Sequence, residues 1–281
     1  MADFSSQNLL GSSHFPSLPV TRFSPGPTLL AFEDIFTRYS KLELSFIDDR
    51  PVALSGLAKR LETFYRTPVT CGIVHRYLHK SLLWQRSGTV RMQKVQYTKT
   101  ATRIPSWSWL AVNGAICYNV QHVRSVWWNQ ALSIVSRPQD SQISLYVLQA
   151  PVWTLENCFI ESSNDTNCRL RDRSQKNLVG WLRFDQYDHT HTSEIGLISI
   201  AKHIQANHGW GLFGEEANVW KEYAQVKWHF SLSRGTYHYV LLVVPNTQSS
   251  ESTTRTYSRV GVGVILEAWI NNKQNDLVDV L

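Results

Sequence analysis

Residues 103–114 read RIPSWSWLAVNG, and the character of the chain changes around this stretch. Before it, apolar residues recur three or four positions apart, which is the spacing of one face of a helix. After it, runs of Val, Ile, Trp, Tyr and Phe are separated by polar, Gly, Asn and Ser breaks, which is typical of strands. The order of the two parts predicts an α+β protein that is mainly β.

Within residues 103–114, two tryptophans alternate with two serines. If the stretch is a strand, Trp107 and Trp109 share one face, and Ser106 and Ser108 share the other. Paired rings of this size suit the packing of helices on a sheet, so core packing is the first interpretation. Lining of a pocket is the alternative.

Residues 31–86 are expected to form a helical cap. Two apolar faces at helical spacing predict two helices, the first with Leu29, Phe32, Ile35, Phe36 and Tyr39, the second with Leu54, Leu57, Ala58, Leu61 and Tyr65. An acidic turn at residues 48–51 joins them, and its Pro51 is suited to begin the second helix. A third short helix is predicted over residues 72–84. Residues 1–30 are rich in Ser, Pro and Gly without periodicity, which predicts an extended or partly disordered arm.

Residues 87–281 are expected to form an antiparallel β-barrel or sandwich, with the helices packed across one end. Together with the cap they make a single domain over residues 31–281. The predicted strands include residues 143–153, 177–184, 195–203, 219–232, 237–244 and 257–269. Apolar and polar residues alternate over residues 223–230, which indicates a half-buried strand.

Composition excludes several classes of protein. The chain has 281 residues, of which 43% are hydrophobic and 18% charged, so it is not intrinsically disordered. Its longest apolar run, residues 239–245, is far shorter than the roughly 18 residues of a membrane helix. The first residues lack a basic segment before an apolar one, so no secretory signal is expected and a cytoplasmic location is predicted. The net charge of +6 is scattered along the chain, which argues against a nucleic-acid partner.

Motifs of metal and covalent catalysis are absent from the sequence. The four cysteines form no C-x-x-C pair and are expected to be free thiols, and there is no G-x-S-x-G elbow or phosphate-binding glycine loop. His75 and His79 are four residues apart but lack the glutamate of H-E-x-x-H. A local group of possible metal ligands reads more simply as a solvated loop; it comprises Asp185, Asp188, His189 and His191. No metal and no cofactor are therefore expected.

The stretch RIPSWSWLAVNG resembles the R-x-P-S-W-S-W-A-S-V-D-G motif in the C-terminal region of fungal heterokaryon-incompatibility (HET) domain proteins. Leu110 and Asn113 depart from that pattern. The order of the surrounding segments is also similar over roughly residues 32–281, which implies a fungal source. Because the chain begins at Met1, the HET domain that mainly carries the incompatibility activity is expected to be absent.

A stand-alone copy of such a scaffold is also similar to the stand-alone Diels-Alderases (norbornene synthases) of sordarin-type diterpene biosynthesis, although no motif carries this second resemblance. It implies a cofactor-free pericyclase that catalyses an intramolecular Diels-Alder cycloaddition of a hydrophobic terpenoid or polyketide. Such a reaction needs a polyene held in a near-attack conformer, and a hydrogen-bond donor to its carbonyl adds stabilisation. The alternative is a non-catalytic HET-related protein of self/non-self recognition or signalling.

Aromatic residues make up 12% of the chain and are the candidates for contact with a hydrophobic substrate. The predicted substrate-binding residues are Trp107, Trp109, Tyr118, Trp128, Trp153, Trp228 and Tyr239. No catalytic residue is assigned. Residues 208–214 combine three glycines with two aromatic residues and form either a plain turn or a lid.

Overall fold

The structure is a computed structural model that describes residues 25–42, 46–98, 103–118, 126–140, 143–161, 168–186, 192–204, 236–246, 255–272 and 276–281. Trp228, the strand expected over residues 219–232 and the possible lid at residues 208–214 lie outside the described residues.

The two long helices of the cap agree with the apolar periodicity. They are α2 (Pro25–Ser40) and α3 (Asp49–Tyr65), and the second begins directly after Asp48. The predicted boundary of the N-terminal arm is wrong, because α2 already begins at Pro25. Proline is tolerated in the first turn of a helix, where its missing N–H has no intrahelical partner in any case.

The third predicted helix is much shorter than expected. Only α4 (Leu78–Leu82) is α-helical, preceded by the 3₁₀ turn η2 (His75–Tyr77). A hairpin of β1 (Val69–Thr70) and β2 (Ile73–Val74) occupies the start of the predicted range. Its turn needs a positive φ at Gly72, which is +75° and incompatible with a continuous helix.

The rest of the chain, where the structure describes it, is mainly β and is built on one sheet of twelve strands. Its main path runs in the order β11-β12-β13-β16-β15-β14-β10-β17, with β7, β8, β9 and β18 attached beside it. The strands are β7 (Val126–Trp128), β8 (Ser133–Asp140), β9 (Ile143–Pro151), β10 (Trp153–Leu155), β11 (Cys158–Glu161), β12 (Cys168–Asp172), β13 (Leu178–Phe184), β14 (Gly196–Ile204), β15 (Thr236–Pro245), β16 (Thr256–Leu266), β17 (Ile270–Asn271) and β18 (Leu277–Val280). Two small antiparallel pairs lie near the cap, β3 (Trp84–Arg86) with β6 (Ile116–Tyr118) and β4 (Gln93–Lys94) with β5 (Val112–Asn113).

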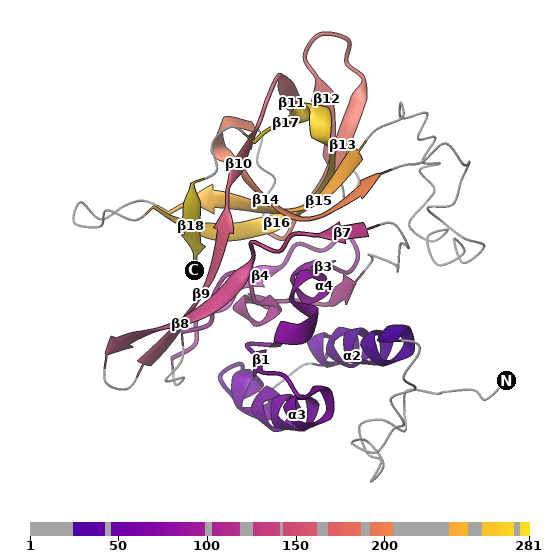
Figure 1. Cartoon of the computed structure of the whole chain (residues 1–281). Coiled ribbons are helices and arrows are strands. Elements are labelled where there is room, and N and C mark those ends of the chain that lie inside the picture. The colour runs from indigo at the N-terminus through magenta and orange to yellow at the C-terminus, as the bar shows by residue number, and fades with distance from the viewer. Residues whose placement is uncertain are drawn as a thin grey trace, which may run out of the picture.

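The pairing of the large sheet is antiparallel, as predicted, except for the parallel contact between β16 and β18. The sheet curls, but among the described strands its main path ends at β11 on one side and β17 on the other without pairing between them (Figure 1). A closed barrel is therefore not confirmed.

Hydrophobic cores lie on both faces of the central strands. On β14, Ile198 and Ile200 belong to the core shared with the cap, and Leu197 belongs to the core inside the curl of the sheet. On β15, Leu241 and Leu242 divide between the two cores in the same way. Burial on both faces explains why these strands are almost continuously apolar in sequence.

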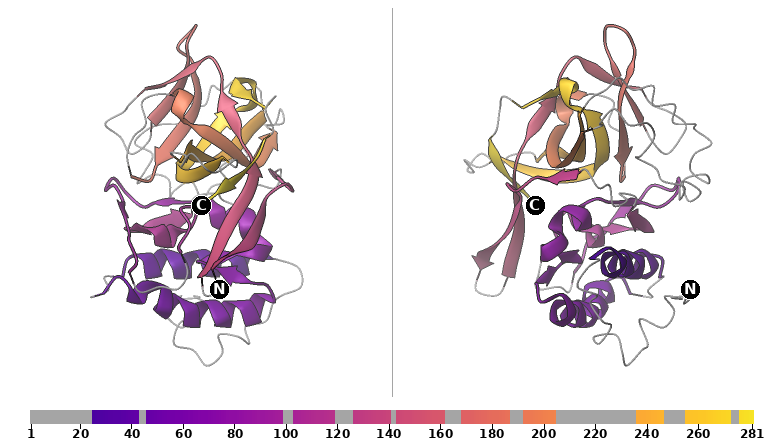
Figure 2. Two further views of the ribbon diagram at one scale, coloured as in Figure 1. Left: turned by 90° about the vertical axis from the view of Figure 1, so that its left-hand side faces the viewer. Right: turned by 45° about the vertical axis from the view of Figure 1, so that its right-hand side comes forward.

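The helical cap lies beneath the curled sheet, and the end of the chain lies between the two parts (Figures 1 and 2). The β8–β9 hairpin extends from the sheet toward the level of the cap in both figures. None of the described helices has the length and apolar character needed to cross a membrane.

Candidate functional site

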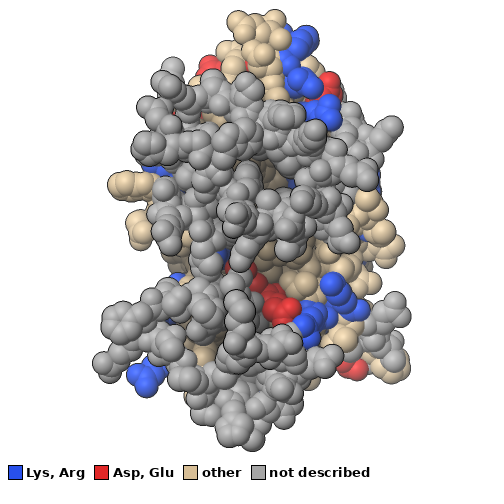
Figure 3. Space-filling model, turned by 90° about the vertical axis from the view of Figure 1, so that its right-hand side faces the viewer, with Lys and Arg blue, Asp and Glu red and all other residues tan. Residues whose placement is uncertain are grey.

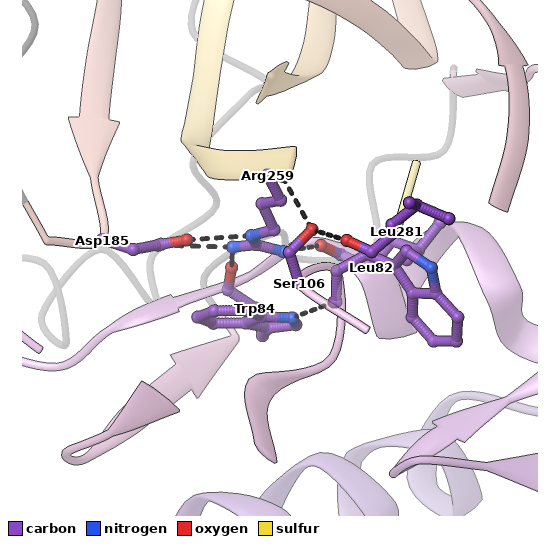
Figure 4. A network of polar contacts seen from close by, with 7 residues as sticks. Leu82, Trp84, Ser106, Asp185, Arg259 and Leu281 are labelled. Carbon is purple, nitrogen blue, oxygen red and sulfur yellow. Dashed lines mark hydrogen bonds and ion pairs between the residues drawn. The ribbon is translucent and has the colours of Figure 1, made fainter. Parts of the chain in front are cut away.

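A buried arginine connects the sheet to the cap. Arg259 lies on β16, and its Nε is 3.0 Å from Oδ2 of Asp185 (Figure 4). Its Nη1 donates to the carbonyl oxygen of Leu82 at 2.6 Å, and Nη2 donates to that of Trp84. The guanidinium carbon also lies 3.4 Å from the centroid of a Trp84 ring. Burial lowers the pKa of Arg259 and the neighbouring Asp185 raises it, so the ion pair keeps a charged group in the interior.

The end of the chain is held at the same junction. The Ser106 hydroxyl donates to the carbonyl oxygen of Leu281 and accepts from the backbone N–H of Arg259 at 2.9 Å (Figure 4). The indole N–H of Trp107 donates to the carbonyl oxygen of Val280 at 3.1 Å. Ser106 and Trp107 therefore join three segments that are far apart in the sequence.

The next two residues of the stretch 103–114, Ser108 and Trp109, contact the cap. The Ser108 hydroxyl donates to the carbonyl oxygen of Cys71 at 2.6 Å, and the Trp109 indole N–H donates to that of Gly72 at 3.2 Å. The guanidinium of Arg50 lies 5.0 Å from the Trp109 ring centroid. These contacts fix the hairpin turn of the cap against residues 103–114.

The expectation that this motif is a strand is wrong. The 3₁₀ turn η3 (Trp109–Ala111) begins within it, and the Ser108 hydroxyl caps that turn by accepting from the N–H of Leu110 at 3.1 Å. The serine hydroxyls bond to the backbone here, which favours turns and caps over a strand. Trp107 and Trp109 are nevertheless fully buried, in agreement with the interpretation as core residues.

A second group of buried polar side chains lies in the cap. Glu33 on α2 is only 8% exposed, and its flanking residues Phe32, Ile35 and Phe36 belong to the core. Burial raises the pKa of Glu33 to about 7, although the positive charge of Lys80 opposes the shift. A large fraction of the Glu33 carboxyl is therefore neutral near pH 7.

Helix α2 packs against β6, and the charge of Glu33 on α2 acts on Tyr118 of β6. The hydroxyl oxygen of Tyr118 is buried and has no hydrogen-bond partner among the described residues. Burial raises its pKa well above the ordinary value, the charge of Glu33 raises it further, and Arg259 lowers it. Tyr118 is also the register partner of Trp84, so this group borders the junction held by Arg259.

Lys80 completes the second group. It lies on α4, is only 7% exposed and has its pKa lowered by burial, against the opposing effect of Glu33. The ring centroid of Phe32 lies 6.5 Å from that of Tyr118 and 6.3 Å from that of Tyr65. We call Glu33, Lys80 and Tyr118 the junction cluster. It combines an acid that titrates near neutral pH with aromatic surroundings.

The other predicted substrate-binding residues are spread over both cores. Trp128 is half-buried and its ring centroid lies 5.4 Å from that of His79 on α4. Trp128 and Tyr239 flank Ala201 on the neighbouring strand, and both pack against the core shared with the cap. Trp153 instead packs against the core inside the curled sheet. The predicted residues that the structure describes therefore do not form one pocket wall.

A buried histidine lies in the second core. Nδ1 of His238 is 2.8 Å from the hydroxyl of Ser199, and Nε2 is 3.3 Å from a carboxylate oxygen of Glu267. The ring of Trp153 meets that of His238 edge-on at 5.4 Å. Ser199 is only 4% exposed, whereas the Glu267 side chain is 47% exposed. A nucleophilic serine must be accessible to substrate, with the acid behind the histidine buried, and here the burial of the two residues is reversed. These contacts are those of a buried histidine whose two ring nitrogens both have hydrogen-bond partners.

No cluster of three or more potential metal ligands occurs within the described ranges. Of the group considered from sequence, Asp185 is paired with Arg259, and Asp188, His189 and His191 lie outside the described residues. On the face seen in Figure 3, the described basic side chains lie among acidic ones and form no single continuous patch.

Sequence reasoning missed Glu33 and Lys80. The sequence feature that could have identified them is a charged residue inside a mainly apolar stretch. Glu33 lies in LAFEDIF, and Lys80 lies in YLHKSLLW. A charged side chain on the buried face of an amphipathic helix requires either a partner or a function.

Comparison of the chain with models of known protein families, with curated proteins and with solved structures returns no match.

Proposed function

We propose that the chain is a cofactor-free cyclase that binds a hydrophobic terpenoid or polyketide at the junction cluster and promotes an intramolecular Diels-Alder cycloaddition. The observation that carries the proposal is the Tyr118 hydroxyl, which is buried without a hydrogen-bond partner among the described residues. The nearby Glu33 carboxyl is also buried, and its pKa is raised to about 7.

An unpaired buried hydroxyl such as that of Tyr118 costs stability in the free protein. A buried polar group that lacks a hydrogen bond costs about 1–3 kcal/mol. A ligand that accepts a hydrogen bond from this hydroxyl removes the cost, and aromatic side chains such as Phe32 and Tyr65 supply an apolar surface for its chain. The cluster therefore has the composition of a site for a hydrophobic molecule with one polar function.

The chemistry of the site suits a cycloaddition. The reaction needs no nucleophile or redox group, only a substrate held with its reacting ends close together. A donor to a carbonyl conjugated with the dienophile stabilises the charge that shifts onto oxygen in the transition state. Tyr118 and neutral Glu33 have the donors for this role.

The test is to incubate the purified protein with linear precursors that carry a diene and a carbonyl-activated dienophile. The rate and stereochemistry of product formation are compared with those in buffer. Acceleration and one dominant stereoisomer are expected, both reduced in Tyr118→Phe. Rates equal to those in buffer for every precursor would refute the proposal.

A second candidate function is non-catalytic self/non-self recognition or signalling, as in HET-related proteins. The observation that favours it is a set of exposed apolar residues at the end of α2 and the beginning of α3, namely Leu42, Phe46 and Val52. Scattered exposed apolar residues are common, but several in one short segment favour a protein contact. Expression in a fungal host, comparing Phe46→Ser with the parent chain for an incompatibility reaction, separates this function from catalysis.

A further inference from the structure

We propose that the outer face of strands β11, β12 and β13 binds an extended acidic segment of a partner protein. The residues that carry the proposal are Arg169 and Arg171 on β12 and Lys176 in the turn that follows, which we call the basic face. Figure 1 places β11 and β12 at the end of the molecule opposite the helical cap. The inference is therefore independent of the proposed function.

The two arginines point to the same side of the sheet. Buried and half-buried residues alternate along β12, and Arg169 and Arg171 are the half-buried ones, so they share the outer face. The register places Glu161 of β11 opposite Arg169 and Phe159 opposite Arg171. Register partners lie on the same face of a sheet, so Glu161 and Phe159 belong to the outer face as well.

The charges on this face do not balance. In the sequence, Asp172 lies among the basic residues, but in the structure it is only 1% exposed. Its carboxylate accepts from the Ser174 hydroxyl at 2.8 Å and from the N–H groups of Gln175 and Asn177 at 2.5 and 2.8 Å. Within the described residues of β11, β12 and β13, Glu161 is then the one carboxylate left on the outer face. The face keeps a net positive charge, to which the exposed Arg173 adds.

Aromatic rings hold two of the cations in place. The guanidinium carbon of Arg169 lies 5.7 Å from the centroid of a Trp181 ring, and Nζ of Lys176 lies 4.4 Å from that of Phe159. The contact between Arg169 and Glu161 is 3.9 Å, which is longer than a hydrogen bond. The Arg169 side chain is 33% exposed. A guanidinium supported in this way can bind a carboxylate through two parallel hydrogen bonds.

The third cation is tied to the other two. Nε of Arg171 lies 2.7 Å from a carboxylate oxygen of Glu161, and Nη1 donates to the carbonyl oxygen of Lys176 at 2.8 Å. These bonds fix the turn that carries Lys176 beside the strand. The three cations therefore form a surface of defined geometry.

This geometry favours a peptide over a nucleic acid. Arg169 and Arg171 are two positions apart on a strand, which is about 7 Å and equals the spacing of alternate side chains in an extended peptide. Asp or Glu residues at every second position of such a peptide can meet both. A single-stranded nucleic acid instead stacks its bases on aromatic rings, and on this face the rings of Trp181 and Phe159 already carry cations.

The experiment measures the binding of labelled peptides to the full chain by fluorescence anisotropy. One peptide alternates glutamate with threonine, and the other has glutamine in place of every glutamate. At low ionic strength the glutamate peptide should bind about tenfold more tightly, since several exposed charge pairs together supply this factor. The advantage should shrink as salt is added, because salt screens exposed charges.

Three variants locate the binding surface. Arg169→Gln combined with Lys176→Gln removes two charges of the basic face and should weaken binding of the glutamate peptide about tenfold. Lys41→Gln combined with Lys59→Gln changes the net charge equally at two exposed lysines of the cap and should change the affinity less than about twofold. Glu161→Gln removes the acid of the face and should tighten binding, a gain that unfolding cannot produce.

Three results would overturn the inference. The first is equal binding of the glutamate and glutamine peptides. The second is an equal loss of affinity in the two double variants, which would assign the binding to net charge alone. The third is tighter binding of a labelled oligothymidine with the same number of charges, which would identify a nucleic-acid partner. Each of them leaves the proposed function standing, because cycloaddition is measured separately with linear precursors.

Discussion

Glu33→Gln should stabilise the protein at high pH and have little effect at low pH. In the folded chain, burial raises the pKa of Glu33 from 4.5 to about 7. Below pH 4.5 the carboxyl is protonated in both the folded and the unfolded chain, so its ionisation costs nothing. As pH rises from 4.5 to about 7, the unfolded chain ionises more readily, and the folded state loses stability relative to it.

The size of this loss follows from the shift. One pKa unit corresponds to 1.36 kcal/mol, so a shift from 4.5 to about 7 gives about 3 kcal/mol above pH 7 as an order-of-magnitude value. Glutamine has nearly the same shape and does not ionise, so the variant should recover most of this free energy at pH 8. Other titrating groups, which also change stability with pH, are the same in both proteins and cancel in the difference.

The assay is urea unfolding of the parent chain and Glu33→Gln at several pH values from 4 to 8.5, followed by tryptophan fluorescence. The difference in the free energy of unfolding should be near zero at pH 4 and should grow through the range 4.5–7. A difference that does not change with pH would refute the claim that Glu33 is neutral in the folded chain near pH 7. A loss of stability in the variant at pH 8 would refute it as well.

Three further predictions concern the framework around the site. Arg259→Met leaves the buried Asp185 without its partner and should cost about 3–5 kcal/mol of unfolding free energy. Arg38→Met, at the exposed pair with Asp34, should cost less than about 1 kcal/mol. Similar losses in the two variants, measured by urea unfolding, would show that the buried ion pair of Arg259 does not stabilise the contact between the sheet and the cap. Gly72→Ala places a Cβ 2.5 Å from Nε1 of Trp109 at a φ of +75° and should lower the melting temperature. Gly56→Ala on α3 meets no atom within 4 Å and should raise the melting temperature slightly, because alanine has the higher helix propensity. An unchanged melting temperature in Gly72→Ala would contradict the packing of Trp109 on this turn. Burial lowers the pKa of His238 below 6.5 despite the opposing Glu267, so protonation favours the unfolded chain and stability should fall as pH drops through about 6.5. His238→Gln should weaken this pH dependence of the free energy of unfolding. An identical pH profile of the two proteins in urea unfolding would contradict the prediction.

Periodicity was sufficient to predict most of the framework. The spacing of Phe32, Ile35 and Phe36 identifies α2, and the apolar runs at residues 237–244 and 257–269 coincide with β15 and β16. Both patterns arise because one helix or strand buries residues at regular intervals, and this spacing can be read from the local sequence alone. The antiparallel sheet over a helical cap could therefore be predicted before the strand order was known.

Features that depend on contacts between distant segments could not be predicted in this way. The serines of residues 103–114 read as one face of a strand, but they bond to Leu281 and to the hairpin turn at Cys71. Among the described strands, β11 and β17 at the two ends of the main path do not pair with each other, and strand periodicity does not encode which edge strands pair.

One residue of the candidate site could be predicted from the sequence, and two could not. Tyr118 could be proposed from its residue type, because buried aromatic side chains with a polar group suit a hydrophobic ligand. Glu33 and Lys80 could not, since their importance lies in their burial beside each other on different helices. Only the packing of α2 against β6 and of α4 against β2 brings these side chains out of water.

The most direct test of the central claim is the rate of cycloaddition of a linear precursor with a carbonyl-activated dienophile, measured with the parent chain and with Tyr118→Phe at pH 6. We expect the parent chain to accelerate the reaction over buffer with one dominant stereoisomer, and Tyr118→Phe, still folded, to lose about tenfold of this acceleration. Equal acceleration by both proteins would contradict the role of the junction cluster, and the buffer rate in both would contradict the proposed function itself.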